Sequence, residues 1–427
     1  MEKGLREQII KLIRREVVPA VGCTEPVAVA LCVAKATETL GSLPETLDLY
    51  LSGNIIKNAM GVGIPGTGMI GLPIAVALGA LVGKSEYQLE VLQDVTAEAV
   101  EQGRKFISED RIKISLDENA PSNLHIDVRV YGEGHKARVV ISGAHTNFIL
   151  VEKDGDVLFE KTAKSEGVDA SSEKDPDLNM RMVYDFAMTA PIEEISFILE
   201  AKRLNLAAAQ FALKGEYGHC LGSTVLHFGE RVFGDTPLAH AITLTSAACD
   251  ARMGGAMVPV MSNSGSGNQG ITATMPVVSY AMDINAPEET TIRALVLSHL
   301  TSIYIKQSLG RLSALCGCVV ASTGATSGLV YLMGGGYDQV CDAVKNMVAN
   351  LTGMICDGAK PSCSMKISSG VSTAMMSAML AMKGFAVTSA EGIISDDVDE
   401  TIHNLTSIGR DSMQVTDKLV LQIMTCK

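Results

Sequence analysis

The spacing of apolar residues in the first 105 positions predicts helices around one short strand. Leu5, Ile9, Ile13 and Val17 recur at every fourth position, which predicts an amphipathic helix at the N-terminus. Residues 47–52 alternate between apolar and polar and are rich in β-formers, so they predict a strand. The turn signal SGN at 52–54 follows, and then the first turn of a helix. A glycine-rich stretch at 61–71 leads into an apolar helix and a more polar one.

The pattern changes between residues 111 and 162. Five short alternating runs begin near residues 111, 123, 136, 146 and 156, with turn residues between them, and they predict an antiparallel meander. Residues 165–179 are polar and rich in Ser, Asp and Glu, which predicts an exposed loop or linker.

From Pro191 onward almost every segment has helical periodicity, with glycine-rich breaks between segments. A chain of 427 residues is too long for one average core, so two domains are expected. The predicted fold class is α+β. Residues 1–190 form a mixed domain with an antiparallel sheet, and residues 191–427 form a mostly α-helical domain.

Composition and charge argue against several classes of function. Hydrophobic residues make up 47% and charged residues 19%, which is a globular composition. The net charge of −13 argues against nucleic acid and anionic membranes as partners. The longest apolar run, residues 69–83, is shorter than the ~20 residues that span a bilayer, and the charged N-terminus does not read as a secretion signal. We therefore expect a soluble cytoplasmic protein, with a homodimer as the protein partner to test.

Two motifs combine a helix start with polar side chains. In GCTEP (22–26), Thr24 or Glu25 is expected to cap the following helix, and Cys23 then lies where the helix dipole stabilises a thiolate. The alternative is a capping motif with an incidental cysteine. In SGNIIKN (52–58), a strand end, backbone N–H groups and Lys57 suit a carboxylate, although an ordinary turn with a surface lysine is the alternative.

A third motif, MSNSGSGNQGITAT (261–274), places three glycines and small polar residues before an apolar helix. This arrangement predicts an anion-binding loop. The sequence matches neither a Walker loop nor the dinucleotide fingerprint. A flexible interhelical loop is the alternative.

The ten cysteines are expected to be reduced, and most of them to be small buried hydrophobes. CDGAKPSC (356–363) differs because two cysteines flank a Gly- and Pro-containing turn. A third thiol comes from Cys316 or Cys318 in LCGC. Three thiolates can hold three irons of a four-iron cluster and leave the fourth iron open as a Lewis acid. Buried thiols without metal are the alternative.

Taken together, GCTEP, SGNIIKN, SGSGNQG and CDGAKPSC, in this order and at these separations, resemble the motifs of the L-cysteine desulfidase family. That family is related to the α-domain of iron–sulfur L-serine dehydratases and is catalogued as the UPF0597 group. The resemblance extends over nearly the whole chain. It implies an α,β-elimination that converts L-cysteine to pyruvate, ammonia and hydrogen sulfide on a [4Fe-4S] cluster.

The resemblance also implies residue roles. Cys23 corresponds to the proton acceptor, and Cys316, Cys356 and Cys363 correspond to the cluster ligands, with Cys318 competing for the first position. Serine dehydratases have a wider gap between the last two ligands, so they support the cluster but not this loop. With Lys57 as a second catalytic residue, the expected substrate-binding residues are Thr24, Glu25, Ser52, Gly53, Asn54, Asn58, Ser266, Gly267, Asn268 and Gln269.

Other functions fit parts of the same pattern. The site could dehydrate L-serine instead, since only the leaving atom differs. A pyridoxal-phosphate lyase could use the loop at 264–270 for phosphate and Lys57, Lys360 or Lys366 for the Schiff base. A small-molecule binding protein without catalysis is the third reading, which the convergent thiols disfavour.

Overall fold

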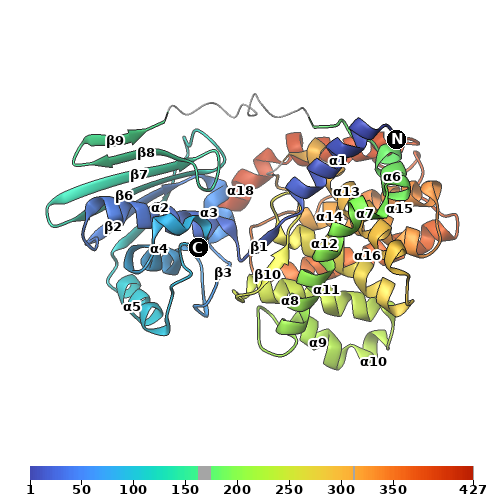
Figure 1. Ribbon diagram of the computed structural model, residues 1–427, viewed down its shortest axis with the longest axis horizontal. Helices are drawn as coiled ribbons and strands as arrows, with labels where there is room; N and C mark the ends of the chain where they lie inside the picture. Colours follow the sequence, from blue (N-terminus) through green and yellow to red (C-terminus); the bar gives the residue numbers. More distant parts are fainter. Residues whose placement is uncertain (162–174, 311–312, 427) are drawn as a thin grey trace.

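The chain folds into a sheet-containing body and a larger helical body that lie side by side (Figure 1). The structure is a computed structural model that describes residues 1–161, 175–310 and 313–426. The predicted α+β fold class is confirmed. Most of the loop predicted at 165–179 lies outside the described residues.

The sheet body is built on a mixed sheet. Among the described residues the sheet has the strand order β5-β2-β6-β7-β8-β9. Its strands are β2 (Thr46–Leu51), β5 (Ile112–Leu116), β6 (His125–Gly132), β7 (His135–Ser142), β8 (Phe148–Lys153) and β9 (Asp156–Glu160). Strands β6 to β9 form the predicted meander.

The prediction that the first of the five runs belongs to the meander was wrong. Strand β5 instead pairs in parallel with β2 and lies at the edge of the sheet. Parallel partners need a long crossover connection, which helices usually supply. Here the crossover contains α3 (Gly53–Ala59), α4 (Leu72–Leu81), a 3₁₀ segment (Ser85–Glu90) and α5 (Ala97–Ser108).

One face of the sheet is apolar and the other is polar. Leu47, Leu49 and Leu51 of β2 are fully buried in the core that includes α2 (Thr24–Leu40) and α4. On the opposite face Asp127 accepts hydrogen bonds from Arg129 and Arg138 at 2.9–3.0 Å. The period-two alternation in the sequence therefore encodes a sheet covered by helices on one face.

The helical body surrounds a second core. Its helices are α1 (Lys3–Glu16), α6 (Met180–Thr189), α7 (Ile192–Ile195), α8 (Leu199–Ala212), α9 (Leu221–Phe228), α10 (Glu230–Phe233), α11 (Pro237–Met253), α12 (Gly267–Asp283), α13 (Glu288–Leu309), α14 (Gly317–Leu332), α15 (Tyr337–Leu351), α16 (Cys363–Met382), α17 (Val398–Ser407) and α18 (Gln414–Thr425). Short 3₁₀ (Ser196–Ile198) and π (Ile408–Ser412) segments join α7 to α8 and α17 to α18.

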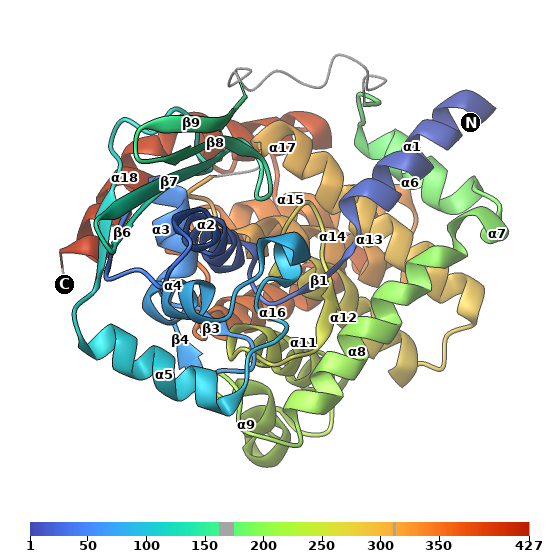
Figure 2. The same ribbon diagram turned by 60° about the vertical axis from the view of Figure 1, so that its left-hand side comes forward.

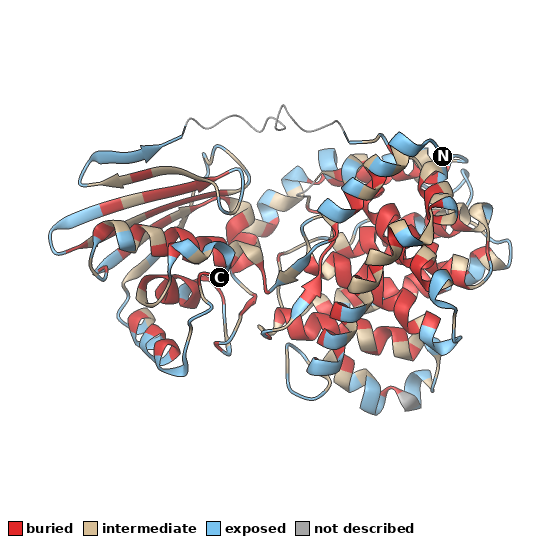
Figure 3. Cartoon of the chain, in the orientation of Figure 1, coloured by how far each residue is buried: buried red, intermediate tan, exposed pale blue. Residues whose placement is uncertain are grey.

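The central helices of this body are buried nearly all round, as Figure 3 shows in red. They approach closely because glycines and small side chains line their contacts. A Cβ at Gly324 on α14 would lie 2.3 Å from the carbonyl oxygen of Ser298 on α13. Such close packing explains how a chain with only 4% aromatic residues fills a large core.

Several segments tie the two bodies together. Helices α1 and α6 precede residue 191 in the chain, yet Ile9, Val183 and Phe186 belong to the core of the helical body. Strand β1 (Pro19–Val21) pairs with β10 (Pro259–Met261), and α18 packs against α3 (Figure 2). The division into domains at residue 190 stays a prediction.

No helix in the described part of the chain has both the length and the apolar character needed to cross a membrane.

Gly324→Ala should destabilise the protein by about 1–3 kcal/mol, because the added methyl group has no room between α13 and α14. Thermal and urea denaturation would measure this change. Gly4→Ala is the control, since a Cβ at this exposed position meets no atom within 4 Å. Equal stability of wild type and Gly324→Ala would contradict the packing argument.

Candidate active site

A pocket of about 160 Å³ lies where the two bodies meet. The predicted residues that line it are Cys23, Glu25, Asn54, Lys57, Asn58, Ser266, Asn268, Gln269, Cys316, Cys356 and Cys363. Thr24, Ser52, Gly53 and Gly267 are not in the lining. All four sequence motifs therefore contribute to one cavity although they are spread between residues 22 and 363 of the chain.

The β1–β10 pair brings the first motif to the third. Val21 lies opposite Pro259, Pro19 lies opposite Met261, and Ser262 N–H donates to the carbonyl of Val18 at 2.8 Å. GCTEP follows β1 directly, and the glycine-rich loop follows β10 directly. This short ladder fixes the two motifs beside each other.

Cys23 is the N-cap residue of α2, in place of the predicted Thr24 or Glu25. Its thiol is buried and donates a hydrogen bond to Glu25 Oε2 at 3.0 Å. Burial raises the pKa of Cys23 far above its usual value, and the nearby Glu25 carboxylate raises it further. The predicted stabilisation of a thiolate is therefore wrong for this structure, because desolvation and a neighbouring negative charge outweigh the helix dipole.

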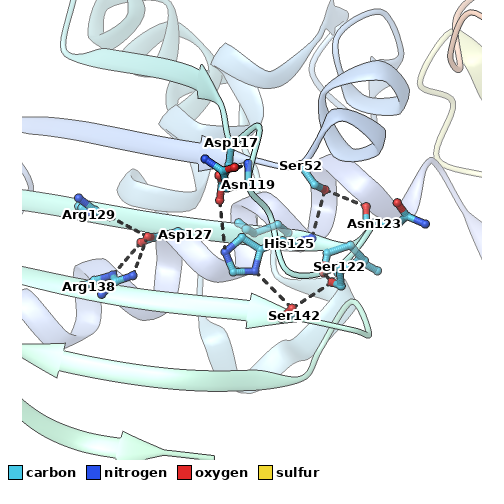
Figure 4. Close-up of polar contacts among 12 residues, drawn as sticks. Ser52, Asp117, Asn119, Ser122, Asn123, His125, Asp127, Arg129, Arg138 and Ser142 are labelled. Atoms are coloured by element: carbon cyan, nitrogen blue, oxygen red, sulfur yellow. Dashed lines mark hydrogen bonds and ion pairs between the residues drawn. The ribbon is translucent and has the colours of Figure 1, made fainter. Parts of the chain in front are cut away.

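A polar network at the point where β2 ends and β6 begins holds the SGN turn in place (Figure 4). Ser52 Oγ donates to the carbonyl of Asn123 at 2.8 Å and accepts from the backbone N–H of His125. The His125 ring in turn contacts Ser142 Oγ at 3.3 Å. Ser52 thus positions the start of α3, which carries Asn54, rather than lining the pocket itself.

Lys57 on α3 is 3% exposed and forms an ion pair with Asp417 on α18. Gly53 lies one turn before Lys57 on α3 and leaves room for Leu421 of α18. A Cβ at Gly53 would lie 2.5 Å from the leucine side chain. The last helix of the chain therefore supplies the partner of the predicted cation.

The glycine-rich loop is hydrogen-bonded to a buried, neutral histidine. His299 is fully buried, and burial lowers its pKa to about 3. The Asn263 amide donates to His299 Nδ1 at 3.0 Å, so the proton lies on Nε2, which contacts Thr274 Oγ1 at 3.0 Å. Asn263 and Ser266 exchange two backbone hydrogen bonds across the loop, and Ser266 Oγ caps α12.

Cys316 and Cys356 are diagonal neighbours across an isolated bridge between Leu315 and Ile355. The hydrogen bond that Cys316 gives to Cys356 lowers the pKa of Cys356 and raises that of Cys316. Cys316 is the N-cap of α14 and Cys363 is the first residue of α16. Helices α14 and α15 lie between Cys316 and Cys356 in the chain.

The loop that carries Cys356 and Cys363 is fixed by a carboxylate between two lysines. Asp357 forms ion pairs with Lys360 and Lys366, which hold its pKa at about 2 against the opposing effect of burial. Gly358 has a φ of +92°, and a Cβ there would lie 1.9 Å from the carbonyl oxygen of Lys57. The loop therefore lies directly against α3.

The thiol donors fit an iron–sulfur cluster better than one metal ion. Within the described residues, no three or more His, Cys, Asp or Glu side chains are grouped so that they could hold a single ion. In a cluster each thiolate binds a different iron, so the ligands need not converge on one point. Four thiols from two adjoining segments line the same cavity, Cys316, Cys318, Cys356 and Cys363, and three of them would match the donor set of a cluster with one open iron.

Three charged residues of the site did not emerge from the sequence motifs. Arg252 near the end of α11 and Lys306 on α13 line the pocket, and Asp417 pairs with Lys57. A signal for Arg252 exists, since it is a charged residue close to the end of a helix of small and apolar residues. Asp417 lies on a polar helical segment with no such signal.

The family model described as "Serine dehydratase alpha chain" matches residues 86–422. This range includes the glycine-rich loop and the three thiols. The chain is 62% identical to a UPF0597 protein of Bacteroides thetaiotaomicron, over 100% of this chain and 99% of the relative. UPF0597 proteins of Porphyromonas gingivalis and Chromobacterium violaceum are 54% and 45% identical, and the alignments cover 100% of this chain and 100% and 99% of those proteins.

The neutral His299 predicts a pH dependence of stability. Its pKa is about 3 when folded and about 6.5 when unfolded, so its contribution is complete above pH 6.5 and is lost as the pH falls toward 3. Between pH 6.5 and 5.5 the wild type should lose about 1 kcal/mol more unfolding free energy than His299→Gln does. Urea denaturation at both pH values measures this difference, with His403→Gln at an exposed position as the control. Equal losses in wild type and His299→Gln would show that the folded protein protonates His299.

Proposed function

The chain belongs to the serine dehydratase alpha chain family, in its UPF0597 group, and we propose that it is an iron–sulfur lyase. The proposed reaction is the α,β-elimination of L-cysteine to pyruvate, ammonia and hydrogen sulfide. The observation that carries the proposal is the convergence of three kinds of group in one pocket. Three thiols, the Cys23–Glu25 pair and an anion-binding loop all line it.

Cys316, Cys356 and Cys363 are the proposed ligands of a [4Fe-4S] cluster. A cluster bound there would supply a Lewis-acidic iron for the leaving group. Cys318 is the weaker candidate for the first ligand, because its thiol is 6% exposed and donates to the carbonyl of Lys366 at 3.1 Å. Reduced thiols of this kind suit the cytoplasm.

Cys23 and Glu25 together are the proposed base. The Cys23 thiol already donates to Glu25, so the carboxylate can take its proton when substrate excludes water from the pocket. The Cys23 sulfur can then take the α-proton of the substrate. Loss of the leaving group gives aminoacrylate, which hydrolyses to pyruvate and ammonia.

The loop at 264–270 and α3 both contribute residues to the lining of the pocket. The first N–H groups of α12 lack acceptors within the helix, and such groups bind a carboxylate well. Asn54 and Lys57 are the contribution of α3, and Lys57 keeps its ion pair with Asp417.

L-Serine is the second candidate substrate, because the matching family model carries the serine dehydratase description. L-Cysteine remains first because a thiol is the softer leaving group and matches iron better. The hypothesis of a pyridoxal-phosphate lyase has less support. Each of its three lysine candidates forms an ion pair with Asp357 or Asp417, whereas a Schiff-base lysine must lose its proton.

Protein purified without oxygen should contain about four irons per chain and absorb broadly near ~400 nm. Cys316→Ser, Cys356→Ser and Cys363→Ser should each lose most of the iron, because each removes one thiolate. Cys341→Ser is the matched control, since this partly buried thiol on α15 does not line the pocket. Iron-free wild type that cannot be reconstituted would refute the cluster, and iron retained by all three variants would refute the ligand assignment.

Cys23→Ala should lower the rate of cysteine breakdown at least ~10²-fold while the iron content stays at four, as expected for the loss of a general base. Glu25→Gln should cause a similar loss if the pair acts as a unit. Pyruvate formation and iron content would be measured on the same samples. Wild-type turnover in Cys23→Ala would remove Cys23 from the mechanism, and a loss only in Cys23→Ala would remove Glu25.

A further inference from the structure

Arg252 is a buried cation of the pocket to which the proposed function gives no role. It is 6% exposed, lies near the end of α11 and lines the pocket. Its Nη1 donates to Asn268 Oδ1 at 3.0 Å, whereas its Nε is enclosed without a hydrogen-bond partner. Within the described residues no carboxylate forms an ion pair with this guanidinium.

A buried cation without a counter-ion is costly, and the cost is offset when an anion binds beside it. The other buried cation of the pocket is already neutralised, because Lys57 pairs with Asp417. A substrate carboxylate that bound Lys57 would share the ammonium group with Asp417, whereas one that bound Arg252 would meet a guanidinium that has no carboxylate partner among the described residues.

The surroundings of Arg252 point to a carboxylate rather than to another anion. Gly267 lets the guanidinium lie against the first turn of α12, since a Cβ there would lie 2.3 Å from Arg252 Nε. The N–H groups at the start of that turn, of which that of Gln269 is capped by Ser266 Oγ, and a planar guanidinium together match a planar carboxylate.

The position also suits the chemistry at the α-carbon. Cys23 lies close enough to Arg252 for the positive charge to act on its thiol. The start of α14 abuts α12, because a Cβ at Gly317 would lie 2.9 Å from the Gln269 side chain. A carboxylate on Arg252 therefore lies in the pocket that the Cys23–Glu25 pair and Cys316 also line.

We propose that Arg252, with the first turn of α12, binds the α-carboxylate of the substrate and so restricts the pocket to α-amino acids. The inference rests on the proposed function and adds a specificity-determining residue to it. Lys57 then acts chiefly in the contact between α3 and α18.

The test compares Arg252→Met and Arg252→Lys with wild type, all purified without oxygen. Pyruvate is the carboxylate probe and cysteamine is a thiol probe without a carboxylate, with binding followed by calorimetry. In Arg252→Met the dissociation constant of pyruvate and the KM for L-cysteine should rise about 10- to 150-fold, and cysteamine binding should not change. The dissociation constant of pyruvate in Arg252→Lys should lie between those of wild type and Arg252→Met. Lysine keeps the positive charge but lacks the planar guanidinium that binds a carboxylate through two N–H groups. Arg203→Met, at an exposed arginine of α8, should behave as wild type.

Unchanged pyruvate binding in Arg252→Met would overturn the inference, and so would an equal weakening of pyruvate and cysteamine. Gly267→Ala is the second variant, which displaces the guanidinium while keeping its charge, and it should weaken pyruvate binding selectively. If it does not, the inference fails even where Arg252→Met does not fold. A wild type that binds pyruvate through Arg252 but breaks down neither cysteine nor serine would refute the proposed function alone.

Discussion

The close contact between Gly358 and the carbonyl of Lys57 is the constraint on which the pocket depends. A hydrogen in place of a side chain lets the thiol-bearing loop touch α3 of the other body, and the left-handed φ turns the loop toward the pocket. Asp357, Lys360 and Lys366 then fix the same loop in one shape. The β1–β10 ladder fixes the opposite wall in the same way. Two small contacts thus align motifs that the chain order keeps far apart.

Burial sets the protonation state of Cys23 in the pocket and of His299, which contacts the glycine-rich loop. Cys23 was expected to be a thiolate because it begins a helix, yet desolvation and Glu25 favour the neutral thiol. His299 stays neutral for the same reason and can therefore accept from Asn263. The pKa values of Cys356 and Lys366 shift against the effect of burial. The Cys316 thiol donates to Cys356 and Lys57 lies near, which lowers the pKa of Cys356. The ion pair with Asp357 raises the pKa of Lys366. Desolvation thus decides at Cys23 and His299, and hydrogen bonds and neighbouring charges decide at Cys356 and Lys366.

Periodicity was sufficient for most helices and strands, and the motifs with the family resemblance gave many of the residues that line the pocket. Leu47, Leu49 and Leu51 showed β2, whereas residues 267–274 of the predicted loop belong to α12. The parallel pairing of β5 was not predictable from its own alternation, since a strand's partner depends on the crossover before it. Asp417 was also missed, because its role exists only through the packing of α18 on α3. Such pairings are tertiary facts that no local pattern encodes.

The charged residues that line the pocket of this acidic chain are mainly positive. A chain of net charge −13 must place cations deliberately if it is to bind a carboxylate. Among the described lining residues the carboxylate of Glu25 stands against the cations of Lys57, Arg252, Lys306 and Lys366. Two of these, Lys57 and Lys366, are neutralised by aspartates outside the lining and so build the walls. Lys57 and Lys366 thus hold the fold through their aspartates, whereas among the described residues Arg252 has no carboxylate partner and is the cation that we propose for the ligand. In that proposal the pairing of each cation, rather than the number of cations, determines where a substrate carboxylate binds.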